Sequence, residues 1–137
     1  MVLLDLAEYL MTQGLGTGAV DLFVNGIPQD APNIVIQDAV MGLIDVPGLA
    51  PLTVHDDPAP SVEQPVVQVE TRGMPYGYNQ AYVRAHQALV ALSSVHNQVL
   101  SGTFYQGIQP LGTIWKLKTD DQNRPYLVFR VLCKKAL

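Results

Sequence analysis

The stretch PVVQVETRGMPYGYNQAYVRAHQALVALSSV, residues 65–95, decides the fold because its hydrophobic period changes partway along. In the first part, Val67, Val69 and Thr71 point one way and the polar residues between them point the other way. This alternation is typical of a strand with one buried face. After a short turn with glycine and proline, residues of the buried face recur at helical spacing, namely Tyr82, Ala85, Leu89 and Leu92. A strand that leads directly into an amphipathic helix predicts a packed layer of sheet and helix.

Further elements are predicted on both sides of this stretch. A helix at about residues 3–13 would end at Gly14 and would bury a stripe formed by Leu3, Leu6, Ala7 and Leu10. Strands are predicted at residues 20–24, 34–36, 65–72, 103–108, 114–118 and 126–133. The order α-β-β-β-α-β-β-β predicts an α+β fold, with one mostly antiparallel sheet and two helices packed on one face.

Two pairings follow from the character of these strands. Residues 20–24 and 34–36 are expected to be antiparallel neighbours, although Pro28 and Pro32 exclude a two-residue hairpin between them. The final strand, residues 126–133, alternates between two largely apolar faces. It is therefore predicted to be central in the sheet or covered by a neighbouring subunit.

Residues 40–64 are the least regular part of the chain. Scattered apolar residues alternate there with four prolines, at positions 47, 51, 58 and 60. A connection of this length inside a compact domain is uncommon and tends to be functional or mobile. We predict a long loop or arm within a single domain of residues 1–137. Two interpretations stay open: an arm that orders against a neighbouring molecule, or a disordered insertion.

Charge is distributed unevenly along the sequence. Residues 1–71 carry ten acidic and no basic side chains, whereas residues 72–137 carry all eight basic and two acidic side chains, for a net charge of −4. In a head-to-tail ring, an acidic surface and a basic surface could meet at every subunit contact. The alternative is that both sets interleave on one mixed surface. The acidic total argues against a dedicated nucleic-acid binder, which normally has a basic footprint.

Composition also limits the cellular context. The longest apolar runs are far shorter than the roughly 20 residues of a membrane span. No basic region precedes the apolar start MVLLDLAEYL, so a signal peptide is not expected and synthesis in the cytoplasm fits. Cys133 is the only cysteine, which excludes an internal disulfide and a cysteine metal cage.

Candidate chemistry is sparse. The GLGTG run at residues 14–18 follows a helix and precedes a strand, the reverse of a phosphate loop, so we interpret it as a helix exit. His55, Asp56 and Asp57 are adjacent on one segment, which favours a solvated acidic loop over a metal site. Ser93, Ser94 or Cys133 would need to meet a histidine and an acid across the fold to form a nucleophilic set. We predict no catalytic, cofactor or metal site, and therefore no enzyme.

The sequence also resembles a known family. The V-Q-V-x-x-R-G strand and the helix after it, which opens with Tyr78 and Ala81, are similar to the tail-terminator or minor-capsid (neck) proteins of long-tailed bacteriophages. The opening LLDLAEYLMTQGLGT, the segment LFVNGIPQDAPNIVIQD, and the late segments GTFYQGI and DDQNRPYLVFRV agree with that family in the same order. Residues 40–64 depart from it, because the corresponding link in the family is usually shorter.

The resemblance implies a structural virion protein that forms a ring, usually of six subunits, at the head-proximal end of the tail tube. Its partners would be other copies of the chain, the tail-tube protein and a head-completion or stopper protein. DNA would pass through the lumen without specific binding. Residues expected at a subunit or partner interface are Asp56, Asp57, Glu63, Arg84, Lys116 and Lys118. A head-closure or stopper protein, and more distantly a monomeric α+β ligand-binding domain or enzyme, remain alternatives.

Overall fold

A computed structural model describes residues 2–28, 36–53 and 60–136 of the chain. Two helices and seven strands are present in these residues. In chain order they are α1 (Val2–Thr12), β1 (Leu22–Val24), β2 (Val40–Thr53), β3 (Pro60–Arg72), α2 (Tyr78–Ser93), β4 (His96–Leu100), β5 (Thr103–Pro110), β6 (Trp115–Thr119) and β7 (Pro125–Ala136).

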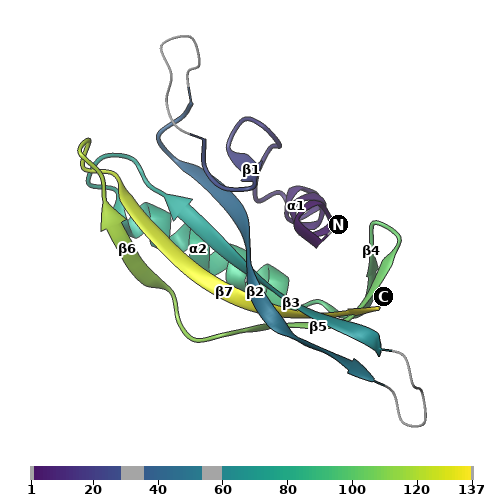
Figure 1. Ribbon diagram of the computed structural model, residues 1–137. Helices are drawn as coiled ribbons and strands as arrows, with labels where there is room; N and C mark the ends of the chain where they lie inside the picture. Colours follow the sequence, from purple (N-terminus) through teal and green to yellow (C-terminus); the bar gives the residue numbers. More distant parts are fainter. Residues whose placement is uncertain (1, 29–35, 54–59, 137) are drawn as a thin grey trace.

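The seven strands form one sheet in which β7 is central. The path runs β1-β2-β3-β7-β5-β4, and β6 pairs with the part of β7 that β5 leaves free. Every pairing is antiparallel except that of β1 with β2 (Figure 1). The predicted α+β class and the central position of the last strand are both confirmed.

Both helices pack on one face of this sheet and close a single hydrophobic core (Figure 1). From β3 and β7, alternate residues point toward the helices, including Val67, Val69, Phe129 and Val131, which are fully buried. On α1 the predicted stripe is buried as expected, and Gly14 ends that helix with a positive φ of 76°. Each such apolar side chain stabilises the fold by about 1.5–3 kcal/mol when it is fully buried.

The prediction for residues 40–64 was wrong in its secondary structure. Most of the segment belongs to two long antiparallel strands, β2 and β3, paired from Val40↔Arg72 as far as Thr53↔Pro60. Prolines are tolerated there because β1 pairs only with residues 41–43. Beyond that point, no described strand pairs with the outer edge of β2, so Pro47 and Pro51 leave no hydrogen bond unmade. Three register shifts, between Val46 and Leu49, between Leu49 and Leu52 and between Leu52 and Thr53, absorb the irregular sequence.

Other elements differ from prediction in smaller ways. Residues 34 and 35 of the predicted second strand lie outside the described residues, and β1 instead has β2 as its parallel neighbour. Sequence patterning missed β4, an edge strand whose side chains are exposed except for Leu100. His96, expected to cap α2, lies in β4. The end of α2 is capped instead by Ser94, whose backbone N–H contacts the carbonyls of Val90 and Ala91.

The junction between β3 and α2 is tightly bonded. The buried Arg72 guanidinium donates to the backbone carbonyls of Gln37 and Asp38, at 2.7 and 2.8 Å. Gly73 allows the chain to leave the strand in a confined space, because a Cβ there would lie 2.6 Å from the carbonyl oxygen of Gly77. Arg72 and Gly73 therefore have a structural role at this junction.

Candidate assembly surfaces

One exposed side of α2 carries a row of aromatic and apolar side chains. Tyr78, Tyr82 and His86 follow one another at four-residue spacing, and their rings stack with centroids 6.4 and 6.3 Å apart. Val90 continues the row one turn further and is also exposed. We call these four residues the aromatic row. Exposed aromatic side chains in a contiguous row are typical of surfaces that other proteins cover.

The sequence of α2 explains why this row faces outward. The helix buries Ala81, Ala85, Ala88 and Leu92, whose mostly small side chains let it lie close to the sheet. The prediction that Tyr82 belongs to the buried stripe was therefore wrong, because the aromatic period runs beside the alanine stripe. No acidic residue and only one basic residue, Arg84, occur in the helix, so its outer side carries almost no charge.

Arg84 points away from the row toward the start of the fold. Its guanidinium lies 3.3 Å from the Asp21 carboxylate and donates to the backbone carbonyls of Asp21 and Ala39, at 3.0 and 3.2 Å. Burial lowers the pKa of Arg84, and the Asp21 carboxylate offsets part of that shift. Arg84 therefore holds α2 against the segments that flank β1.

The turn before α2 presents a further tyrosine. Tyr76 is 83% exposed and has a positive φ of 59°, a conformation that costs a non-glycine residue about 1–2 kcal/mol. Its backbone N–H donates to the carbonyl of Asn123 at 2.8 Å, and the N–H of Gly77 closes the turn on Met74 at 2.7 Å. The turn between β6 and β7 thus holds Tyr76 in a strained, outward position beside the aromatic row.

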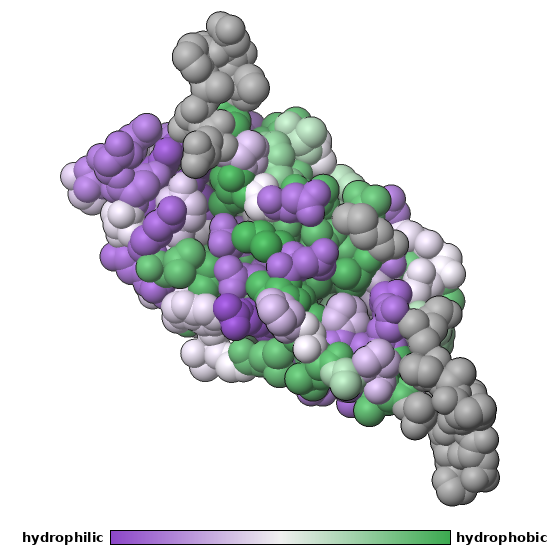
Figure 2. Space-filling model, viewed as in Figure 1, coloured by the Kyte–Doolittle hydropathy of each residue, from purple (hydrophilic) through white to green (hydrophobic). Residues whose placement is uncertain are grey.

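Another surface of low polarity lies at the far end of the sheet. Residues 47–52 of β2, PGLAPL, carry no charge, and Leu49 and Leu52 are 58% and 45% exposed. We call this segment the arm. Gln64 of β3 fixes its base by donating to the carbonyl of Ala50 at 2.8 Å. Figure 2 shows apolar side chains gathered over this end of the sheet face that the helices leave open.

The remainder of the open face mixes polar and apolar groups (Figure 2). The Nε of Arg130 donates to Gln68 at 2.9 Å, and Gln68 in turn donates to Glu70 at 3.2 Å. The guanidinium of Arg130 also lies 5.9 Å from the centre of the Trp115 ring. These contacts link three strands, β3, β7 and β6, across this face.

Acidic and basic halves of the sequence meet within one chain. Asp38 lies 3.2 Å from Arg124, and Glu63 lies 2.9 Å from Lys135, in addition to the pair formed by Asp21 with Arg84. For these groups, acidic and basic side chains interleave on the surface of one molecule. Two of the expected interface residues, Glu63 and Arg84, therefore have partners inside the chain. Asp56 and Asp57 lie outside the described residues.

Lys116 and Lys118, both expected at a subunit or partner interface, point to opposite faces of the sheet. A register shift falls between them, so that Lys116 is opposite Leu127 and Lys118 is opposite Tyr126, which are adjacent residues of β7. Lys118 lies over the Tyr126 ring on the open face, 4.6 Å from its centre. Lys116 lies on the helix side, in a shallow hollow that Tyr76 and Tyr78 also line.

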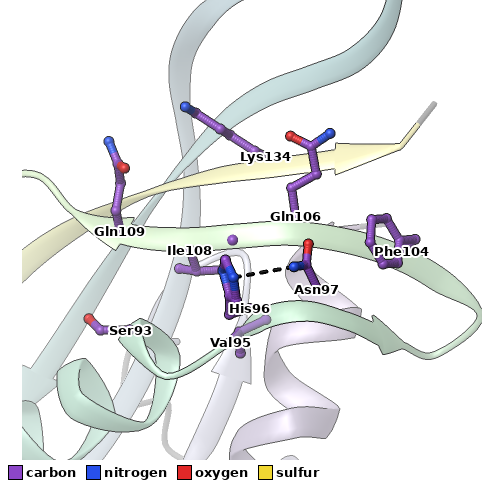
Figure 3. A pocket seen from close by; sticks show the side chains of 10 residues that line it. Ser93, Val95, His96, Asn97, Phe104, Gln106, Ile108, Gln109 and Lys134 are labelled. Atoms are coloured by element: carbon purple, nitrogen blue, oxygen red, sulfur yellow. Dashed lines mark hydrogen bonds between the residues drawn. The ribbon is translucent and has the colours of Figure 1, made fainter.

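A pocket at the end of α2 is lined by both a serine and a histidine, so its other lining residues bear on the enzyme alternative. It lies between α2, β4 and β5, where His96 hydrogen-bonds Asn97 at 3.2 Å (Figure 3). Ser93 lies at the helix end, while Gln106, Gln109 and Lys134 extend to the other side of the pocket (Figure 3). None of the residues that line it is a carboxylate, so the pocket lacks the acid of a nucleophilic triad.

Other reactive groups in the described residues are also poorly placed for catalysis. Cys133 is fully buried, and burial raises the pKa of its thiol to about 12, so that it stays protonated at neutral pH. The described side chains include no cluster of three or more groups able to hold a metal ion. In residues 2–28, 36–53 and 60–136, no helix is long and apolar enough to cross a membrane.

The fold resembles that of a chain from a virion. A solved structure described as "Virion of native gene transfer agent (GTA) particle" contains a chain that superposes with a TM-score of 0.57. The alignment covers 96% of this chain and 84% of that chain, at 13% sequence identity. At that identity the likeness establishes a shared fold. No protein-family model and no curated protein sequence matches the chain.

Sequence reasoning missed the aromatic row as a surface, whereas an arm within residues 40–64 that orders against a neighbouring molecule was one of the two interpretations left open. The row had a signal, since Tyr78, Tyr82, His86 and Val90 recur every four residues in a helix without acidic side chains. The arm had a weaker signal, namely eight consecutive uncharged residues, 46–53, in an acidic half of the chain. Both signals are depletions of charge, which hydrophobic periodicity alone does not detect.

Proposed function

We propose that this protein is a structural component of a virion, and specifically a tail terminator. In this role it closes into a ring, six subunits in the family that the sequence resembles, on the head-proximal end of a tail tube. The observation that carries the proposal is the likeness of nearly the whole fold to a chain from a gene transfer agent virion. The ordered resemblance of the sequence to tail terminators, from the first helix to the last strand, supports the finer assignment.

The surfaces of the molecule support an assembly role. Charged residues are depleted at the cores of protein interfaces, whereas tyrosine and methionine are enriched there. The aromatic row together with Met74 and Tyr76 has this composition, and the arm has no charge. Exposed apolar surface of this kind costs solubility in a monomer, and association removes that cost.

Termination needs no chemistry beyond shape. A heterologous interface whose rotation closes produces a ring of fixed size. If one face of the ring reproduces the stacking contact of the tube and the other does not, growth of the tube ends where the ring binds. The second face is then free to bind the protein that completes the head. This accounts for a small fold without an assembled catalytic set in its described residues.

DNA would cross the lumen of such a ring without being held. Phosphate attraction supplies most of the non-specific affinity of proteins for DNA, and it requires uncompensated basic side chains on the lining. The chain has a net charge of −4, and Arg84, Arg124 and Lys135 are each paired with a carboxylate. A lining rich in unpaired lysine and arginine in an assembled ring would contradict this part of the proposal.

The test combines the mass of the purified protein with its effect on tube growth. Light scattering over a concentration series and negative-stain images should show closed rings, either alone or when tail-tube protein is added. Added during tube polymerisation, the protein should bind one end and shorten the tubes. If rings form but ignore the tube and bind the portal side, the protein is a head-closure or stopper protein. If it neither forms rings nor binds either partner, the virion assignment fails.

A further inference from the structure

The turn that carries Tyr76, where the aromatic row begins, and the arm lie at opposite ends of the same strand. Leu52 of the arm pairs with Val62 near the start of β3, and the turn that carries Tyr76 follows Arg72 at the end of β3. The ten residues between Val62 and Arg72 span about 33 Å at the rise of an extended strand. Figure 1 shows the same separation, with the turn before α2 at the upper left and the end of β2 at the lower right. Leu49 and Leu52 are opposite Gln64 and Val62, on the face of the sheet that the helices leave open, whereas the row lies on the outer side of α2 on the other face. One molecule therefore cannot join its own two surfaces.

These two surfaces are complementary in chemistry. The arm offers leucine and proline side chains, and the row and its turn offer the faces of Tyr76, Tyr78 and Tyr82. Proline and leucine against tyrosine is a common pairing in recognition, because a rigid apolar group meets a flat aromatic one at little cost in conformational entropy. Both surfaces lack charges at their centres, so no ionic group would be buried without a partner.

We propose that the arm of one copy of this chain docks on the aromatic row of the next copy, with Tyr76 as part of the contact. The inference rests on the proposed ring, and it names the contact that closes it. Because the two surfaces differ, the contact is heterologous, and each molecule offers one donor and one acceptor surface. Repetition of the same contact around an axis then generates a ring with no unsatisfied copy of either surface.

The arm would dock through side chains and not by adding a strand. Pro47 and Pro51 have no N–H to donate, which disfavours a continuous ladder between this part of β2 and another chain. The three tyrosines are 83%, 45% and 41% exposed and so offer roughly 300 Å² in total, given about 150–250 Å² for an aromatic side chain. That area is the centre of an interface, not the whole of one, since a standard interface buries about 800 Å² per partner.

The deciding experiment mixes two variants that are each defective on one surface. The arm variant carries Leu49→Asp and Leu52→Asp, and the row variant carries Tyr78→Glu and Tyr82→Glu. All four positions are exposed, so both variants should fold. Each variant alone should remain a monomer at concentrations where the wild-type chain assembles, as measured by sedimentation velocity. Mixed in equal amounts, they retain one intact arm and one intact row and should form dimers that do not grow.

Matched controls separate this contact from a general effect of charge. Val99→Asp places an acid on exposed β4, and Gln87→Glu places one on α2 outside the row. Both variants should assemble within about twofold of wild type.

The outcomes distinguish this inference from the proposed function. If the arm and row variants still form rings, or if their mixture stays monomeric while the wild type assembles, the docking contact is wrong and the terminator can stand. A wild-type chain that is monomeric even at millimolar concentration also overturns the docking contact. If the mixture gives dimers but the wild-type rings ignore the tail tube, the docking contact stands and the terminator assignment fails.

Discussion

At one end of β3 the chain is bonded from several sides, and at the other end the neighbouring arm leaves its leucine side chains exposed. Around Arg72, two backbone carbonyls accept from the guanidinium, and Gly73 donates its N–H to the carbonyl of Pro125 at 2.9 Å. Around the arm, Gln64 makes one bond to Ala50 and the leucines face outward. The bonded end fixes the position of Tyr76 and α2, and the arm offers surface to another molecule. A single strand thus connects the fixed end, which carries Tyr76 and α2, to the arm, whose leucine side chains are exposed.

The largest effect is expected at the bonded end, from Arg72→Ala. The substitution removes two charge-assisted hydrogen bonds from a buried group and leaves the carbonyls of Gln37 and Asp38 without their donor. The free energy of unfolding should fall by about 3 kcal/mol, measured by urea denaturation. Arg130→Ala is the matched control, since Arg130 is exposed, and it should cost less than about 1 kcal/mol. Equal losses of unfolding free energy in the two variants would show that the hydrogen bonds of Arg72 do not hold this end of β3 more firmly than an exposed arginine would.

Two glycines at opposite ends of β3 sharpen the comparison. A Cβ added at Gly73 or at Gly48 would lie 2.6 Å from a carbonyl oxygen, that of Gly77 or Gln64. Gly73→Ala should cost about 2–3 kcal/mol because the bonds around it resist displacement, whereas Gly48→Ala should cost about 1 kcal/mol because the arm can shift. Thermal unfolding of both variants measures the difference. Gly107→Ala is the control, since the nearest atom would be 3.9 Å away.

A smaller, pH-dependent effect is expected from Asp120→Asn. Desolvation opposes ionisation of Asp120, but hydrogen bonds from the backbone and guanidinium of Arg124 and from the backbone of Gln122 together hold its pKa below the ordinary value. A carboxyl with a lowered folded-state pKa contributes stability above its unfolded pKa and loses it as the pH falls through the folded pKa. Wild type should therefore lose this contribution below about pH 4.

The variant should be less stable at neutral pH by about 1–2 kcal/mol, because it keeps only part of the hydrogen bonding. Its stability should also change less than that of wild type between pH 5 and pH 3, as followed by denaturation at each pH. A parallel loss in both proteins would mean that Asp120 does not hold the turn that supports Tyr76. Asp121→Asn, one residue along and exposed, provides the control.

Much of the bonded half of the molecule could be predicted from sequence, because its periods are regular. The stripe of α1, the alternation in β3 and the roles of Arg72 and Gly73 each follow from a local pattern that tertiary contacts reinforce. Tyr82 was misplaced because tyrosine fits either a buried or an exposed position. In α2 the adjacent alanines face the sheet, and Tyr82 is exposed. Which residues pack inside depends on how closely the helix approaches the sheet, and helical period alone does not give that distance.

The strand structure of the arm and the orientation of the two lysines of β6 could not be predicted, for a different reason. Prolines at 47 and 51 argue against a strand only when both of its edges are paired, and pairing is a property of the whole sheet. The opposite orientation of Lys116 and Lys118 depends on a one-residue register shift, which reverses every side chain beyond it. Neither the edge position nor the shift leaves a local sequence signal.

The smallest effect on stability is expected at the arm itself, where it contrasts most strongly with the effect of Arg72→Ala at the other end of β3. Leu49 is 58% exposed, so Leu49→Asp removes little buried surface and should change the free energy of unfolding by less than about 0.5 kcal/mol. Circular dichroism during urea denaturation, at a concentration where the chain is monomeric, measures this directly. The same substitution should reduce assembly at least about tenfold if the arm is an interface anchor. A large loss of stability would instead mean that Leu49 packs inside its own chain, and the arm would then belong to the core and not to a contact between subunits.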